Sequence, residues 1–217
     1  LGEITGGMNF AADTLKKTGI DAALGINQIS EKMEQTAKGN ADPGEFFNLF
    51  KNSELLGEDE YRWYKDNIVT MFDDHDMVSQ LEIKSRFCAD KTTGKLLLNA
   101  LFLNLMTPGI PCIYYGSEQC FDGSGNIDNM VREAMFAGDF GAFRSYGKHF
   151  FDTDHFVYCE LKQIIKLRKK NMTLTQGRMF LREISENGIQ FELPKKNPEK
   201  RFDGVIAWSR LFSSDEI

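Results

Sequence analysis

The stretch TPGIPCIYYGSE, residues 107–118, decides the fold of this chain, because it ends one helix and starts one strand. Ahead of it, Thr92–Met106 is apolar on most sides, which predicts a buried helix that begins at a capping threonine. The Thr-Pro-Gly triplet then interrupts the helix, since proline lacks the backbone N–H that the next turn needs. Ile110–Tyr115 is a short apolar run, as expected for a strand buried on both faces. Alternation of helix and buried strand is typical of parallel β/α units.

The same alternation extends from this stretch toward both ends of the chain. Further strands are predicted at Ile20–Leu24 and Asn67–Phe72, and further helices at Asn9–Thr18, Ile29–Ala37, Glu45–Lys51 and Asp154–Lys170. The charged and aromatic segment Gly57–Tyr64 is expected to lie outside this repeat. A closed (β/α)8 barrel needs eight strands and about 250 residues, so the roughly four units of this chain are too few for one.

The sequence pattern changes after Asn171, from alternating helices and strands to strands alone. Met179–Ile184, Gly188–Leu193 and Val205–Trp208 are strand-like runs separated by turns. We therefore expect a β/α segment over residues 1–172, followed over residues 173–217 by the start of a small all-β domain.

The composition excludes several classes of function. The formal net charge of −6 argues against a nucleic-acid partner, which requires a basic face. No apolar run approaches the roughly 20 residues of a membrane span, so we expect no membrane association. The four cysteines form no close pair of the kind that binds zinc, which leaves no metal or other cofactor expected in this chain. Unpaired cysteines weakly favour a cytoplasmic location.

Acidic residues lie just past three strand ends, the first of which is represented only by Leu1-Gly2. They are Glu3, the group Asp73, Asp74 and Asp76 with His75 among them, and Glu118. In β/α barrels the carboxyl ends of the strands carry the active site. Two carboxylates from different strands are what glycoside cleavage requires, since one protonates the leaving oxygen and the other attacks or stabilises the sugar cation. The alternative is that these acids are ordinary loop residues or helix caps.

Three segments resemble the alpha-amylase family of glycoside hydrolases. Residues 107–118 resemble the last barrel strand of that family, with its Pro-Gly and Tyr-Tyr-Gly-x-Glu elements. Phe72-Asp73-Asp74-His75-Asp76 resembles the family segment that ends in Asn-His-Asp, and Gly2-Glu3-Ile4 resembles the Gly-Glu segment around the acid/base. The resemblance covers nearly the whole chain, in the family's order and spacing.

The resemblance implies a role for each matching residue. Glu3 would be the catalytic general acid/base, and Asp76 would be the catalytic carboxylate that stabilises the transition state. His75 would bind the same sugar. Asp74 stands where the family usually has Asn, and Glu118 would bond the loop backbone near the site.

The family's nucleophile is an Asp in an Arg-x-Asp motif at an earlier strand end, and no predicted strand of this chain ends in one. The resemblance therefore implies the C-terminal half of a (β/α)8 TIM barrel, about strands five to eight, which alone would be inactive. The parent would be a retaining glycosidase that acts on α-glucans, malto-oligosaccharides or related α-glucosides. The alternatives are a transglycosylase (glucosyltransferase) of the same family, or a catalytically dead member that binds sugar or protein partners. Calcium is a candidate ligand of the full-length family member, and the open edges of a half barrel favour a dimer.

Overall fold

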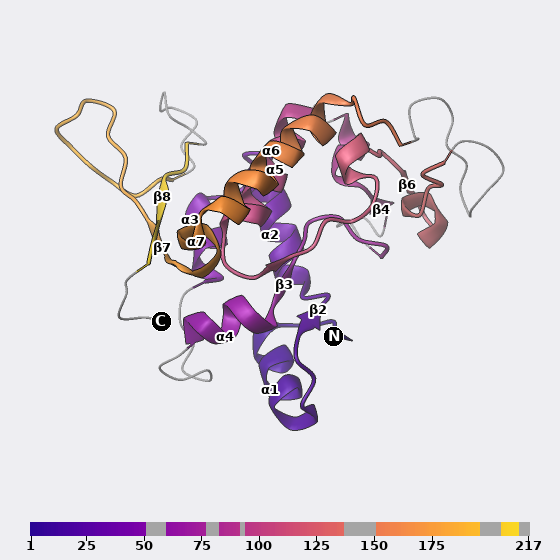
Figure 1. Ribbon diagram of the computed structural model, residues 1–217, viewed down its shortest axis with the longest axis horizontal. Helices are drawn as coiled ribbons and strands as arrows, with labels where there is room; N and C mark the ends of the chain where they lie inside the picture. Colours follow the sequence, from indigo (N-terminus) through magenta and orange to yellow (C-terminus); the bar gives the residue numbers. More distant parts are fainter. Residues whose placement is uncertain (51–59, 77–82, 92–93, 137–150, 196–204, 213–217) are drawn as a thin grey trace. The chain divides into compact units, whose positions relative to one another are not determined.

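The computed structural model describes residues 1–50, 60–76, 83–91, 94–136, 151–195 and 205–212 (Figure 1). The chain divides into two compact units. The first comprises residues 1–70, 106–111 and 168–217, and the second comprises residues 71–105 and 112–167. Within the described residues, no helix combines the length and the apolar character that a membrane crossing requires.

Short parallel strands form the framework of the first unit. They are β1 (Gly2–Glu3), β2 (Ala23–Leu24), β3 (Val69–Thr70) and β5 (Ile110–Pro111). β1 pairs with β2 and β3 pairs with β5, both in parallel, and a parallel bridge between Ala23 and Ile68 joins the two pairs. The order is therefore β1–β2–β3–β5, which confirms the predicted parallel β/α arrangement. The described strands do not close into a barrel.

The strand that the sequence places at Ile110–Tyr115 is much shorter in the structure, where β5 ends at Pro111. Proline has no N–H to donate, so the ladder cannot continue through it. Before the strand, Gly109 adopts φ +115, and a Cβ there would lie 2.5 Å from Thr70 Cγ2. Only glycine allows so close an approach between these strands.

Four helices accompany these strands: α1 (Met8–Thr18), α2 (Asn27–Ala37), α3 (Pro43–Asn48) and α4 (Glu60–Asn67). α1 ends at Gly19, whose left-handed backbone lets its N–H bond Leu15 O. α3 begins at Pro43 behind the cap Asp42, whose side chain accepts from Gly44 N at 2.8 Å. The prediction that Gly57–Tyr64 lies outside the repeat is wrong for its described end, because α4 starts at Glu60. The buried Tyr64 ring, which meets Phe50 edge-on at 5.2 Å, anchors this helix.

The second unit is centred on α5 (Gly94–Met106), the helix that the sequence predicts over Thr92–Met106, with Thr92 itself outside the described residues. Leu97, Ala100 and Leu101 are 0% exposed, as expected for a helix that is apolar on most sides. α6 (Phe156–Lys170) begins against α5 (Figure 1). A Cβ on Gly94 would lie 2.2 Å from the Phe156 ring, so glycine permits the contact.

The remainder of the second unit is a set of short elements after β3 and β5. β4 (Lys84–Ser85) pairs antiparallel with β6 (Ser124–Gly125). The 3-10 turns η1 (Phe87–Asp90) and η2 (Ser117–Gln119) lie between these strands in the chain, and η3 (Asp128–Val131) follows β6. All four cysteines lie among the described residues, and none forms a disulfide.

The C-terminal part of the first unit is a hairpin. α7 (Met172–Gln176) leads into β7 (Arg178–Leu181), which pairs antiparallel with β8 (Trp208–Leu211). Of the predicted strand Gly188–Leu193, only an isolated bridge from Glu192 to Ile184 is formed. Arg210 is buried and donates to Gly177 O at 2.8 Å and to Met106 O at 2.7 Å. The proposed boundary between residues 172 and 173 stays a prediction.

Candidate functional site

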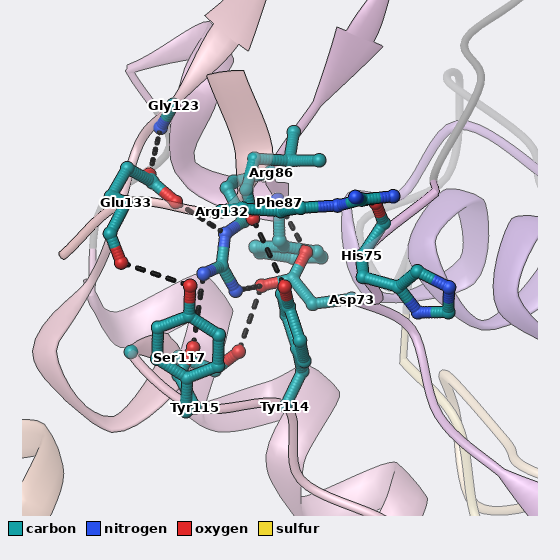
Figure 2. Close-up of polar contacts among 12 residues, drawn as sticks. Asp73, His75, Arg86, Phe87, Tyr114, Tyr115, Ser117, Gly123, Arg132 and Glu133 are labelled. Atoms are coloured by element: carbon teal, nitrogen blue, oxygen red, sulfur yellow. Dashed lines mark hydrogen bonds and ion pairs between the residues drawn. The ribbon is translucent and has the colours of Figure 1, made fainter. Parts of the chain in front are cut away.

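The candidate site is the segment Asp73–Asp76, which follows β3 at the start of the second unit. Asp73, only 2% exposed, fixes the base of this segment. Its carboxylate accepts from Phe87 N at 2.7 Å and from Ser117 Oγ at 2.8 Å (Figure 2). The segment therefore leaves the strand from a rigid, buried point.

A buried arginine lies under this point. Arg86 donates from Nε to Glu133 Oε2 at 3.1 Å and from NH2 to Tyr115 O at 3.0 Å. Its NH1 lies 3.9 Å from Asp73 Oδ2. The guanidinium also lies over the Tyr114 ring, 4.2 Å from its centroid. One cation is thus shared between two buried carboxylates and an aromatic face.

Glu133 and two tyrosines complete the network around Arg86; Glu133 is buried, whereas Tyr115 is 37% exposed. Glu133 Oε1 accepts from Gly123 N at 2.7 Å, so both of its oxygens are bonded. The Tyr114 hydroxyl donates to Val131 O at 3.2 Å, and the Tyr115 hydroxyl donates to Glu133 O at 2.9 Å. Burial raises the pKa of Tyr114 well above its ordinary value, so this hydroxyl remains a donor at neutral pH.

The loop after β5 is fixed by the predicted backbone contact of Glu118. Its Oε2 accepts from Gly116 N at 2.9 Å, within the same turn. Gly116 adopts φ +87, and a Cβ there would lie 2.3 Å from the Phe121 ring. The Gly-x-Glu element therefore shapes the loop that carries Ser117 to Asp73.

His75 and Asp76 lie on the accessible side of the segment. Asp74 Oδ1 accepts from Asp76 N at 2.6 Å, a turn that an Asn oxygen would make equally well. This bond explains in physical terms why Asp can occupy a position where Asn is expected. Arg132 Nε donates to His75 O at 3.0 Å, and the Asp76 carboxylate pairs with Lys84 (Figure 2 shows Arg132 and His75).

Lys84 is shared with a second carboxylate. Its Nζ lies 2.7 Å from Asp128 Oδ1, and Arg132 NH2 donates to Asp128 Oδ2 at 3.2 Å. The hydrogen bonds to Asp128 and Asp76 raise the pKa of Lys84, and the bond from Lys84 lowers the pKa of Asp128. Sequence reasoning missed these residues. The spacing of four between Asp128 and Arg132, which is that of a common ion pair, was the available signal.

Glu3 lies in the first unit, at the carboxyl end of β1, and its side chain is exposed. The neighbouring Gly25 adopts φ +88, and a Cβ there would lie 3.5 Å from Glu3 Cγ. The structure thus brings His75 and Asp76 together within the second unit and places Glu3 in the other. The catalytic and binding roles of these three residues stay predictions.

Metal binding finds no support among the described residues. In that part of the chain, no three His, Cys, Asp or Glu side chains are grouped as metal ligands. The calcium ligand expected for the full-length family member stays a prediction.

Comparison with known proteins begins with a negative result, since no family model matches the chain. The chain is 26% identical over 166 residues to an alpha-amylase of Niallia circulans, which covers 76% of this chain and 26% of that protein. It is 30% identical over 129 residues to a cyclomaltodextrin glucanotransferase of Paenibacillus macerans, which covers 59% of this chain and 15% of that protein. The chain thus spans about a quarter or less of the length of these curated relatives.

Solved structures agree on the fold. The chain matches an Anoxybacillus alpha-amylase with a TM-score of 0.63 at 21% identity, over 95% of this chain and 36% of the other. It matches an alpha-amylase from H. orenii with a TM-score of 0.62 at 18% identity, over 98% of this chain and 41% of the other. These likenesses show that the chain has the fold of a part of these proteins.

Proposed function

We propose that this chain, which is a member of the alpha-amylase family, supplies the acid/base and the transition-state-stabilising carboxylate of a retaining α-glucan-cleaving enzyme. The observation that carries the proposal is the match of three strand-end segments, in order, to a family whose relatives are named alpha-amylases and cyclomaltodextrin glucanotransferases. We infer that the chain is the C-terminal half of the barrel from the order of these three segments. The four described parallel strands, which follow one another in chain order, support a segment of such a barrel.

Each residue has a defined part in the proposed reaction. Glu3 protonates the glycosidic oxygen and later takes a proton from the attacking water. Asp76 and His75 hold the hydroxyls of the sugar whose bond breaks, and the Asp76 carboxylate stabilises its positive charge. The substrate is an α-glucan, a malto-oligosaccharide or a small α-glucoside.

The nucleophile is expected outside these 217 residues. A retaining mechanism needs two main carboxylates about 5 to 5.5 Å apart, one of which attacks the sugar. No described strand ends in Arg-x-Asp. The 217-residue chain alone should therefore show no turnover of a maltoside above that of its Glu3→Gln variant.

A hybrid enzyme tests the proposal. It joins this chain to the part of the Niallia circulans alpha-amylase that precedes the region of similarity. We expect the hybrid enzyme to cleave maltoheptaose, and we expect Glu3→Gln and Asp76→Asn to lower kcat by about 10²-fold or more. Asp13→Asn, an exposed carboxylate on α1, is the matched control and should leave kcat unchanged. Equal activity of all four proteins would refute the proposal, and an inactive hybrid enzyme would favour a catalytically dead, sugar-binding member.

Transfer is the second candidate reaction, because the relative with 30% identity is a glucanotransferase. Hydrolysis and transfer share the covalent intermediate and differ in whether water or a sugar hydroxyl attacks it. The products of the hybrid enzyme from maltoheptaose distinguish them, since longer or cyclic glucans would demonstrate transfer.

A further inference from the structure

The segment that carries His75 and Asp76 is held by two cationic side chains from other elements. Arg132 donates to the carbonyl oxygen of His75, and Lys84 pairs with the carboxylate of Asp76. Both cations meet at Asp128, which accepts from each of them through a different oxygen. We call Lys84, Asp128 and Arg132 the charged clamp.

The clamp stands on a rigid base. Lys84 lies opposite Gly125 in the β4–β6 pairing, and Arg86 N, just past β4, donates to Gly123 O at 2.9 Å. A Cβ on Gly125 would lie 2.3 Å from Met130 Cγ, so η3 packs directly on β6. This packing sets Asp128, the first residue of η3, across from Lys84.

The contacts of the clamp are of a kind that contributes little to stability. The side chains of Asp76, Asp128 and Arg132 are 38 to 49% exposed, and such ion pairs are worth about 0 to 1 kcal/mol. By contrast, the ion pair of Arg86 and Glu133 is 0% exposed on both sides, and both oxygens of Glu133 accept hydrogen bonds. The arrangement of the clamp is therefore better explained by the orientation of the segment than by stabilisation of the fold.

We propose that the charged clamp is a positioning device, in which Lys84 sets the carboxylate of Asp76 and Arg132 sets the backbone of His75 for contact with the sugar. The part of this inference that concerns sugar binding rests on the proposed function. The part that concerns the position of Asp76 and His75 rests on the geometry alone. A displacement of a catalytic group by about 1 Å can cost 10²-fold in rate, so ion pairs that add little to stability can still govern turnover.

The first test needs no substrate. Hydrogen exchange of the Asp76 amide, measured by NMR on the full 217-residue chain, reports on the bond that it donates to Asp74. We expect Lys84→Met and Arg132→Met to speed this exchange by about tenfold or more while the exchange of α5 amides is unchanged. Lys84→Arg should retain the slow exchange. Lys17→Met, which removes an exposed ion pair on α1, is the matched control. Exchange at Asp76 that is unaffected in both clamp variants would overturn the inference.

The second test uses the hybrid enzyme. We expect Lys84→Met to lower kcat by about 10-fold to 10²-fold with little change in KM, and Lys84→Arg to restore most of it. In the Asp76→Asn background, Lys84→Met should have no further effect, because the group it positions has lost its charge. Additive losses would overturn the inference.

The two proposals fail in different ways. If Asp76→Asn lowers kcat and Lys84→Met does not, only the positioning role is lost. If Asp76→Asn itself has no effect on kcat, the proposed function is lost, while the exchange experiment still decides whether the clamp holds the segment.

Discussion

Arg86 Nε and Glu133 Oε2 lie 3.1 Å apart, with both side chains 0% exposed. The backbones of Gly123 and Tyr115 bond Glu133 Oε1 and Arg86 NH2, while the buried Arg86 NH1 makes no hydrogen bond and lies 3.9 Å from Asp73 Oδ2. The pair connects β4 to the segment after η3, beneath Asp73. It is therefore a buried ion pair that links two distant segments of the second unit.

Removing one partner of this pair should destabilise the chain strongly. Glu133→Leu leaves the Arg86 guanidinium buried without its main carboxylate, which costs about 3 to 5 kcal/mol. We expect urea unfolding to show a loss of this size, and a smaller loss for Glu133→Leu combined with Arg86→Met. A double variant that is as unstable as the sum of the singles would contradict the interpretation.

Gly109 should tolerate substitution less well than another glycine with a left-handed backbone. Gly109→Ala would place a Cβ 2.5 Å from Thr70 Cγ2 and 3.1 Å from Ile68 O, between β3 and β5. Gly39 also has positive φ, at +71, but no atom lies within 4 Å of a Cβ there. Gly39→Ala should therefore cost about 1 to 2 kcal/mol, the cost of the backbone conformation, and Gly109→Ala clearly more. Equal melting temperatures of the two variants would count against the close approach.

Glu3→Gln in the hybrid enzyme should distinguish an acid catalyst from a binding residue. General acid catalysis contributes about 10² to 10⁴-fold, but only when the leaving oxygen needs a proton. We expect a large fall in kcat on maltoheptaose and a small one on an aryl maltoside with an activated phenol. An equal loss on both substrates would remove Glu3 from that role.

The ion pair of Lys84 and Asp128 should contribute to stability at neutral pH and lose this contribution in acid. The pKa of Asp128 is lowered in the folded state, so its contribution to stability is present above the ordinary carboxyl pKa of about 4 and is lost as pH falls through the lower folded value. The pKa of Lys84 is raised, so loss in alkali begins only above its ordinary value of about 10.4. Urea unfolding of the wild type and Asp128→Asn should differ at pH 7 and converge toward pH 2. A difference that is constant with pH would contradict this.

The isolated chain should associate with itself. β1 and β5 are the ends of the described strand order, and strand edges without partners pair readily with other chains. Leu1 is 74% exposed and Ile110 is 37% exposed at these two edges. We expect light scattering at several concentrations to show a dimer or larger species. A stable monomer with cooperative unfolding would show that the edges are covered in another way.

The sequence predicts most of the helices and the parallel β/α arrangement, because periodicity and helix-terminus signals are local. Gly19 ends α1 as expected. The start of α3 was predicted two residues late, at Glu45, although Asp42 and Pro43 are typical of a helix start. The length of β5 was not predictable from its apolar run, since Pro111 ends the pairing although the residues after it are still apolar. α4 was missed because its sequence is charged, while one buried ring, Tyr64, holds it in place.

The residues of the candidate site also divide into those that local sequence predicts and those that it does not. Asp73–Asp76 and Glu118 could be found from motifs that are contiguous in the chain. The clamp could not, because Lys84 and Asp128 are 44 residues apart and meet only through the β4–β6 pairing and the packing of η3. Contacts between loops of this kind are set by tertiary structure and leave no periodic signal.

Arg210 has a practical consequence for anyone who shortens the gene. Its guanidinium occupies the carbonyl oxygens of Met106, at the last turn of α5, and of Gly177, before β7. A truncated protein that ends before β8 would lack Arg210, so the carbonyl oxygen at the end of α5 would lose its donor. A buried carbonyl left without a donor lowers the free energy of unfolding by about 1 to 3 kcal/mol. Through Arg210, strand β8 thus supports the loop that leads into β5. Expression trials should therefore keep the coding sequence through Leu211.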